Sequence, residues 1–558
     1  MPDREAGLRI EGLKHSNLKT GVSHDLYQVR RSQMNSSVAA LRFFFKITLG
    51  GADLATRLAR VHYPRRLPRI SSPLQASMML ELLRPCRVMS LMSTSALEER
   101  IRRVMSDLRE ETTIPGQYGS PSLVHQRMAQ TCTPALSVGV IDNFEVAWAA
   151  GFGTLAAGAE PATANTPFQS GSISKPVFAL AVMKLVETGT IDLDTDVSDY
   201  LKSWHMPGKD GWQPRVSLRQ LLSHTAGTTV HGFPGYPASG PWPTVPQILG
   251  GAPPANTQPV VVDILPGTQF RYSGGGTTIA QQVVVDVTGT PFPELMREVI
   301  LDPVGMADSG YEQPAPSGFA RRAARGHPLN GTEIEGSYHV YPEMAAAGLW
   351  TSAADLALLG AEIMRALRSD ASKLALAPET VNSMLRPQLP DQQIGQEFVG
   401  LGWFCAGKEQ NFRFFHDGWN HGYVAAMLML PAIGKGAVVL LNSNQGWMLL
   451  GEIKAAIGRE YGWPALKDVP EISNVVPDVA YAGIYENGNG KIMVARDGNR
   501  LLVEFAHQRA LPVYPAAAGE FFARAINLRL RFAGGDTARP PELTVVNGNK
   551  TESFKRTD

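Results

Sequence analysis

The spacing of apolar residues predicts four amphipathic helices after residue 92. In each of them apolar side chains recur three or four positions apart, which places them on one face of a helix. The four ranges are 95–108, 172–189, 277–287 and 353–367. Ser95 and Glu98 form a capping box at the start of the first helix, and Gly189 is a C-terminal stop signal for the second.

Runs of strand-forming residues between those helices predict an antiparallel sheet. They comprise one hairpin and three successive strands, at 136–149, 412–415, 423–430 and 436–442. Because hairpin and meander strands alternate with helical stretches, the pattern indicates an α+β domain. Residues 231–260 contain eight prolines, which exclude regular structure and predict a stiff surface loop.

The pattern changes again at about residue 474. Short runs of strand formers there alternate with turn signals such as Asn487–Gly490 and Asn547–Gly548. The runs lie at 491–495, 501–505, 526–532 and 543–546. We interpret this C-terminal segment as a small antiparallel β-barrel.

Composition places the chain among globular proteins of several domains. Its 558 residues are 44% hydrophobic and 18% charged, and the length favours roughly two to four domains. The three cysteines, Cys86, Cys132 and Cys405, are far apart, so they predict neither a disulfide framework nor a zinc site. A formal net charge of +1 does not point to nucleic acid as a partner.

The charge is unevenly distributed, because residues 1–90 hold 15 Lys and Arg but only 6 Asp and Glu. Alternative interpretations are an organellar address, a nucleic-acid arm, or sequence upstream of a true start at one of Met78, Met79, Met89 and Met92. We favour a poorly ordered basic N-terminal extension. The apolar run 38–49 is interrupted by Arg42 and Lys46, so it predicts no membrane span, and we expect a cytoplasmic protein.

The strongest chemical signal is Ser172-Ile-Ser-Lys175 at the start of the second helix. Three positions are close to one helical turn, so the serine hydroxyl and the lysine amine can lie side by side. A desolvated lysine can lose its proton and activate the serine, and the helix N-terminus adds free N–H groups beside an oxyanion. Ser16–Lys19 has the same pattern but lacks a strong amphipathic helix. The sequence has no G-x-S-x-G, H-E-x-x-H or P-loop motif.

Two further motifs carry candidate groups. Tyr272 follows the turn Pro266–Gly267 and is a candidate proton carrier, for which a nearby ammonium would have to lower its pKa from about 10. His416, followed by Gly418, stands at the predicted end of a strand and is a candidate for binding a substrate carboxylate or carbonyl. The structural alternatives are a tyrosine that caps a packed loop and a surface histidine in a turn.

Taken together, the motifs S-x-x-K, Y-S-x and H-x-G in this order resemble those of the penicillin-recognising serine hydrolases. That superfamily includes class C β-lactamases, D,D-peptidases, D-aminopeptidases and family VIII carboxylesterases. The resemblance spans about residues 95–465 and includes Leu221–Gly227 and Gly348–Asp355, which we interpret as packing and helix-start motifs.

The resemblance implies a β-lactamase/transpeptidase-like antiparallel sheet flanked by helices and followed by a small antiparallel β-barrel. We accordingly expect three parts. They are a basic N-terminal extension at 1–90, a β-lactamase-like catalytic domain at 91–470 and a lipocalin-like barrel at 471–558.

The resemblance also implies roles for individual residues. Ser172 would be acylated, Lys175 would be its base, and Tyr272 would carry the proton to the leaving group. The backbone N–H groups of Ser172 and Trp419 would form the oxyanion hole. His416, the first residue of the H-x-G motif that ends at Gly418, would stand where β-lactamases and D,D-peptidases carry the lysine of K-T-G.

Two departures from the family pattern bear on the substrate. Gly274 replaces the asparagine whose carboxamide holds the substrate amide, and His416, a weaker and pH-dependent cation, replaces the lysine. Both changes weaken the case for recognition of a β-lactam or of D-Ala-D-Ala and leave acyl transfer intact.

We therefore predict a serine hydrolase that acts on short peptide or amide substrates, including ones with D- or non-standard residues. The alternatives are a carboxylesterase or β-lactamase with the same machinery, and a non-catalytic ligand-sensing protein. We expect no cofactor, no metal and no membrane or nucleic-acid partner. Whether Asn420 and His421 touch the substrate stays open.

Overall fold

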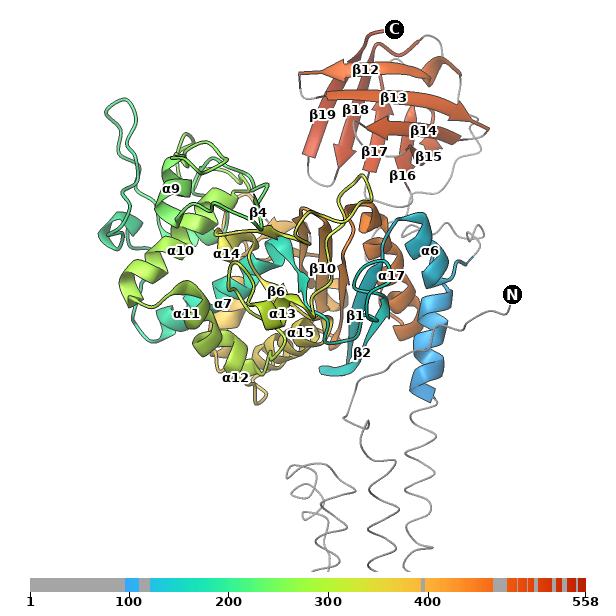
Figure 1. Cartoon of the computed structure of the whole chain (residues 1–558). Helices are drawn as coiled ribbons and strands as arrows, with labels where there is room; N and C mark the ends of the chain where they lie inside the picture. Colours follow the sequence, from blue (N-terminus) through green and yellow to red (C-terminus); the bar gives the residue numbers. More distant parts are fainter. Residues whose placement is uncertain are drawn as a thin grey trace, which may run out of the picture. The chain divides into compact units, whose positions relative to one another are not determined.

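The computed structural model describes residues 96–109, 121–392, 397–464 and 479–558, the last range with gaps at 489, 499, 506–509, 524–527, 534–538 and 548–549. Residues 103–558 belong to the larger of two compact units (Figure 1). The predicted first helix is present at 96–106, whereas its cap at Ser95 and the predicted extension 1–90 lie outside the described residues.

The centre of the larger unit is a seven-stranded antiparallel sheet with strand order β2-β1-β11-β10-β9-β8-β7. Its strands are β1 Ala135–Asp142, β2 Glu145–Gly153, β7 Phe398–Val399, β8 Phe404–Ala406, β9 Arg413–Asn420, β10 Tyr423–Leu430 and β11 Lys435–Leu441. Every residue of β10 is buried, as expected for a central strand with both faces covered. This sheet confirms the predicted α+β fold class.

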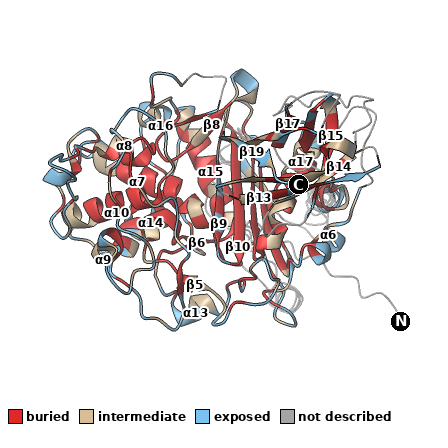
Figure 2. Ribbon diagram, turned by 90° about the horizontal axis from the view of Figure 1, so that it is seen from above, coloured by how far each residue is buried: buried red, intermediate tan, exposed pale blue. Residues whose placement is uncertain are grey.

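Helices cover both faces of the sheet (Figures 1 and 2). On one face, α15 (Ala353–Leu367) lies so close to β1 that a Cβ on Gly139 would come within 2.5 Å of the Ala353 carbonyl oxygen. On the other face, the indole of Trp148 donates a 2.8 Å hydrogen bond to the Tyr461 hydroxyl of α17 (Trp447–Tyr461). Gly139 pairs with Ala149, the neighbour of Trp148, so the alternation of side chains along β2 separates the two helices.

Three further helices, α7 (Ser174–Glu187), α10 (Gly274–Thr288) and the short α14 (Met344–Ala347), pack against one another through α14. The first ten residues of α7 are all buried, so this helix runs through the core and not along the surface. Figure 2 shows the buried residues gathered in these helices and in the sheet beside them. Lys175, in the first turn of α7, is therefore surrounded by protein, whereas Ser172 in the turn before it is half-buried.

The prediction that residues 231–260 lack regular structure is wrong. They contain the helix α9 (Val245–Gly250) and the short strand β4 (Tyr236–Pro237). Thr244 caps the helix through the Gln247 amide, and a proline lies in its first turn, where its missing N–H removes no helical hydrogen bond. The number of prolines in a segment does not reveal whether a proline lies in the first turn of a helix, where it is tolerated, or in the helix interior, where it is not.

The position of His416 within its strand also differs from the prediction. The strand was expected to end at Phe415, but β9 continues to Asn420, so the H-x-G motif lies inside the strand. Strand β8 pairs with β9 only up to Phe415, and beyond that point the same edge faces the turn before α7. Gly418, the glycine of the motif, permits this close approach because it has no side chain.

The C-terminal strands form a closed antiparallel barrel, which confirms the predicted β-barrel. They are β12 Gly483–Asn487, β13 Gly490–Asp497, β14 Arg500–Phe505, β15 Leu511–Ala517, β16 Glu520–Ala523, β17 Leu528–Phe532, β18 Glu542–Asn547 and β19 Lys550–Arg556. Leu528, Leu530 and Phe532 are buried, whereas Arg529 and Arg531 are exposed. The period-2 pattern thus fills the interior with apolar side chains.

Candidate active site

Ser172 lies in a 3-10 turn, η1 (Gly171–Ile173), immediately before α7. The turn is held from both sides by one residue of the predicted Gly348–Asp355 motif. The Leu349 carbonyl accepts hydrogen bonds from the Ser170 N–H (3.0 Å) and hydroxyl (3.1 Å), and the Leu349 N–H donates to the Ser174 hydroxyl (2.9 Å). The motif therefore fixes the residues on either side of Ser172.

Lys175 brings an amine to the serine. Its Nζ lies 3.0 Å from Ser172 Oγ and donates a 2.8 Å hydrogen bond to the Ala346 carbonyl of α14. The side chain is buried, and burial lowers the pKa of Lys175 to about 7. A large fraction of this lysine is consequently a free amine at neutral pH, able to accept a proton.

Tyr272 completes the convergence of the three predicted groups. Its ring centre lies 5.0 Å from Lys175 Nζ, and its hydroxyl interacts with the hydroxyl of Ser172. The expected fall in the pKa of Tyr272 does not occur: burial raises the pKa, and the contact with Ser172 offsets this only in part. The physical reason is that burial disfavours the charged phenolate more than the contact with Ser172 favours it, so Tyr272 is a protonated phenol at neutral pH.

His224, in the predicted Leu221–Gly227 motif, fixes the backbone on both sides of Tyr272. Its carbonyl accepts a 2.8 Å hydrogen bond from the Arg271 N–H, and its Nδ1 accepts one from the Ser273 N–H at 3.2 Å. The rings of His224 and Tyr272 also pack together, with centroids 4.3 Å apart. A motif interpreted as packing thus positions the phenol.

Two glycines allow η1 to lie against the edge of β9 that β8 leaves unpaired. A Cβ on Gly418 would overlap the Ser170 carbonyl oxygen, and a Cβ on Gly171 would lie 2.6 Å from the Trp419 backbone nitrogen. Gly171 also has a φ of 53°, in the left-handed region that favours glycine. The Trp419 amide is therefore adjacent to the nucleophile turn.

His416 is buried, and it was expected to act as a weak cation. Its Nδ1 lies 2.6 Å from the Asp417 carbonyl oxygen, which can only accept, so Nδ1 carries the proton and Nε2 has a lone pair. Among the described residues, Nε2 has no hydrogen-bond partner. Burial, and secondarily the charge of Lys175, lower the pKa of His416 to about 3. The expectation of a cation is therefore wrong: desolvation keeps the imidazole neutral at neutral pH.

The space next to Gly274, where the family carries an asparagine side chain, is filled by the preceding loop. A Cβ on Gly274 would lie 3.0 Å from the ring of Phe233 and 3.3 Å from the His231 carbonyl oxygen. The Gly274 N–H donates to that same carbonyl at 2.9 Å. No substrate-binding amide group can therefore be presented from this position without displacing Phe233.

The two residues left open by the sequence have different environments. The Asn420 side-chain amide is buried and donates hydrogen bonds to Gln169 Oε1 and to the Ala347 carbonyl, each at 3.0 Å. It therefore links β9 of the sheet to α14. The His421 ring stacks on His339 with centroids 4.5 Å apart and lines a pocket beside Trp419.

Sequence reasoning did not identify the Ala346 carbonyl, the Phe233 ring or the loop at Pro328–Asn330 as parts of this region. A backbone carbonyl carries no sequence signal, because every residue has one. The loop residues come near the site only through tertiary contacts. Trp350, Trp403 and Cys405 are buried in the core.

The described ranges contain neither a candidate metal site nor a candidate membrane-spanning helix. No group of three or more histidine, cysteine, aspartate or glutamate side chains there is arranged to hold a metal ion. None of the helices described for this chain combines the length and the apolar character needed to cross a bilayer.

Comparison with known proteins agrees with this geometry. A family model described as "Beta-lactamase" matches residues 121–456, which is more than half of the chain. Esterase EstB of Burkholderia gladioli is 26% identical over 305 residues, covering 49% of this chain and 69% of that protein. Unguisins hydrolase ungD of Aspergillus violaceofuscus is 23% identical over 481 residues, covering 74% and 82%.

Among solved structures, the octameric penicillin-binding protein homologue from Pyrococcus abyssi superposes with a TM-score of 0.52 at 20% identity. The match covers 77% of this chain and 98% of that one, and it shows a shared fold. Together with the extent of the family match, these observations show that the chain belongs to the β-lactamase family of serine hydrolases.

Proposed function

We propose that this protein hydrolyses carboxylic esters through an acyl-enzyme formed at Ser172. One observation carries the proposal: Lys175 Nζ lies 3.0 Å from Ser172 Oγ, and burial lowers the pKa of the lysine to about 7. A serine hydroxyl is a weak nucleophile unless a base takes its proton during attack. A buried amine with this pKa is such a base at neutral pH.

In acylation, Ser172 Oγ bonds to the substrate carbonyl carbon while its proton passes to the free amine of Lys175. The backbone N–H groups of Ser172 and Trp419 stabilise the oxyanion. The bond from carbon to the alcohol oxygen then breaks, and Tyr272 gives its phenolic proton to that oxygen. The Lys175 ammonium returns a proton to the phenolate, so the serine proton has in effect moved to the alcohol.

Deacylation repeats these steps with water as the nucleophile. Water adds to the acyl carbon as its proton passes to the free amine of Lys175, and the bond to Ser172 Oγ breaks as the Lys175 ammonium returns that proton to the serine. The free acid leaves, and all three side chains return to their starting protonation states. The raised pKa of Tyr272 suits this role, because the phenol must be protonated when the alcohol departs.

Two features support ester substrates over β-lactams and peptides with a free carboxylate. Phe233 fills the space beside Gly274 from which a carboxamide would hold a substrate amide. His416 is neutral, so it offers a hydrogen-bond acceptor at Nε2 and no charge to pair with a carboxylate.

A second candidate is hydrolysis of amide bonds in short peptides, including ones with D- or non-standard residues. The observation in its favour is the similarity to unguisins hydrolase ungD, which extends over 74% of this chain. In either case the partner is a small-molecule or short-peptide substrate.

A labelling and turnover experiment tests the proposal. A fluorophosphonate probe is expected to modify Ser172 and not Ser170 or Ser174, as mapped by peptide mass spectrometry. Initial rates on matched p-nitrophenyl esters, aminoacyl p-nitroanilides and a chromogenic cephalosporin are expected to be highest for the esters. Higher rates on the anilides would favour the peptide candidate, and absence of both labelling and turnover would leave a ligand-sensing protein.

Replacing Tyr272 by phenylalanine is expected to lower kcat/KM for alkyl esters about 100-fold, because the departing alkoxide loses its proton donor. The loss should be smaller for p-nitrophenyl esters, whose leaving group departs readily as an anion. Steady-state rates on a methyl ester and a p-nitrophenyl ester of the same acid measure both effects. Tyr200→Phe, which removes a phenol elsewhere, is the control, and equal losses on the two esters would contradict the assignment.

A further inference from the structure

The catalytic groups divide the edge of β9 into two sides. Tyr272 packs near His416, with ring centroids 6.2 Å apart. Trp419, whose amide adjoins the nucleophile turn, lies three residues further along the strand, roughly 10 Å away at the usual rise per residue. His421 follows in the turn toward β10. The proton donor and the Trp419–His421 side therefore lie in opposite directions from the reacting carbon.

This division orients a bound substrate, if the proposed function is taken as given. The leaving group must lie within reach of Tyr272, because the phenol protonates it. The carbonyl oxygen is directed to the amides of Ser172 and Trp419. The remaining substituent on the carbonyl carbon is the acyl chain, which must point away from Tyr272 and along β9 toward His421.

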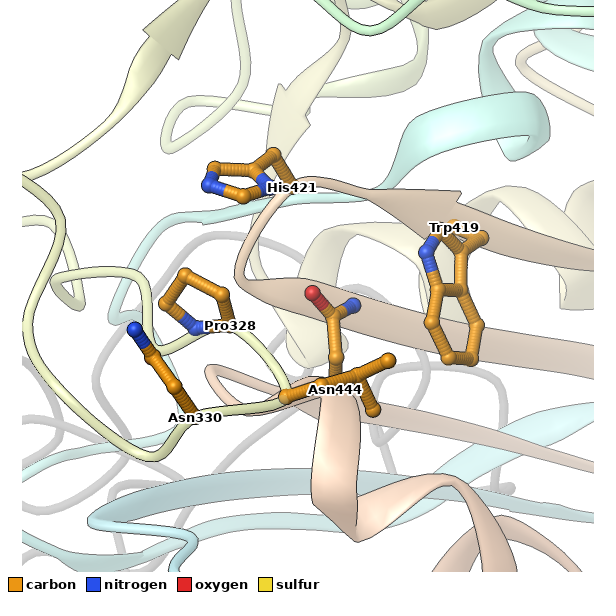
Figure 3. A pocket seen from close by; sticks show the side chains of 6 residues that line it. Pro328, Asn330, Trp419, His421 and Asn444 are labelled. Carbon is orange, nitrogen blue, oxygen red and sulfur yellow. The ribbon is translucent and has the colours of Figure 1, made fainter. Parts of the chain in front are cut away.

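A pocket of about 330 Å³ lies at that end of the strand. It is lined by Pro328, Leu329, Asn330, Trp419, His421 and Asn444. Figure 3 shows Trp419 and His421 on the hairpin between β9 and β10, facing Pro328 and Asn330 across the hollow, with Asn444 between them. The volume is at the low end of the range for ligand pockets, about 300–1,000 Å³, so it suits one arm of a substrate.

The lining of this pocket is uncharged and mostly apolar. Leu329 and Trp419 are 37% and 49% exposed, so both present apolar surface to a ligand in the pocket. Asn444 is fully engaged: its Oδ1 accepts from the Gly422 N–H at 2.7 Å, and its Nδ2 donates to the Asn420 and Tyr423 carbonyls. None of the six lining residues is acidic, lysine or arginine.

The histidine in the lining is also uncharged at neutral pH. Burial, and the neighbouring His339, hold the pKa of His421 below its ordinary value. A charged acyl group would therefore lose its water of hydration here without gaining an opposite charge, whereas an apolar group would be stabilised by burial.

We propose that the pocket between Trp419 and Leu329 binds the acyl group of the substrate and selects bulky, uncharged acyl groups. An adjoining hollow shares Pro328, Asn330 and His421 but also contains Glu333 and Glu335. If that hollow received the acyl group instead, a positively charged end would be favoured. The two occupants are chemically distinct, so one substrate series separates them.

The test compares p-nitrophenyl acetate, hexanoate and 6-aminohexanoate, which share one leaving group. The hexanoate is expected to have the highest kcat/KM. Leu329→Ser is expected to lower the hexanoate-to-acetate ratio about tenfold, because it makes the pocket wall polar. Leu329→Trp, which fills the pocket, should lower the same ratio. Leu123→Ser, which alters a leucine of similar exposure (39%) elsewhere, is the matched control and should leave it unchanged.

The outcomes distinguish this inference from the function on which it rests. Turnover with a hexanoate-to-acetate ratio that neither Leu329 variant changes would overturn the acyl pocket alone. A preference for 6-aminohexanoate would also overturn it and would place the acyl group in the adjoining hollow. Absence of ester turnover together with an unlabelled Ser172 would overturn the proposed function, and the acyl pocket with it.

Discussion

Lys175→Met is expected to lower kcat/KM about 10⁴-fold, the upper end of the range for loss of a general base. The amine lies 3.0 Å from Ser172 Oγ, and methionine keeps most of the buried volume while removing the proton acceptor. Steady-state rates on a p-nitrophenyl ester measure the loss. A thermal unfolding curve similar to that of the unmodified protein would show that the variant is folded.

The pH dependence of the unmodified protein gives an independent check. Below the Lys175 pKa of about 7 the amine is protonated and cannot act as a base, so kcat/KM should rise with pH through this value and level off above it. Lys175→Arg should be about as inactive as Lys175→Met, because a guanidinium does not lose its proton. Substantial activity in Lys175→Arg would mean that positive charge, and not proton transfer, is what Ser172 requires.

Gly418→Ala is expected to lower kcat/KM about 10²–10³-fold, comparable to the loss of one oxyanion donor. The added methyl group would overlap the Ser170 carbonyl oxygen, so η1 and β9 would have to separate. That movement would carry the Ser172 hydroxyl away from the Trp419 amide. The variant should also lose about 1–3 kcal/mol of unfolding free energy, typical of overpacking, as measured by urea denaturation.

Gly250→Ala is the matched control for this second prediction. Gly250 ends α9, and a Cβ added there meets nothing within 4 Å. This change should leave both activity and stability close to those of the unmodified protein. If Gly418→Ala behaved like Gly250→Ala, the close packing of η1 on β9 would not be what positions the Trp419 amide.

The fold class was accessible from the sequence because it depends on local periodicity. The helix predicted at 353–367 matches α15 residue for residue, since its apolar positions follow one face and Ser352 caps its start. The C-terminal barrel was predicted from alternating residues and turn signals. Local rules failed at α9, where a proline in the first turn is compatible with a helix, and at β9, which continues past Phe415.

The sequence by itself determined which groups are available and in what order. Ser172 and Lys175 are about one helical turn apart, Tyr272 follows a turn, and His416 stands two residues before Gly418. Their spacing on the helix is a local property, so S-x-x-K already predicted the contact between hydroxyl and amine. Only the tertiary structure decided their protonation states. Burial makes Lys175 a base, keeps Tyr272 protonated and holds His416 neutral, and burial depends on what packs around a residue and not on its neighbours in sequence.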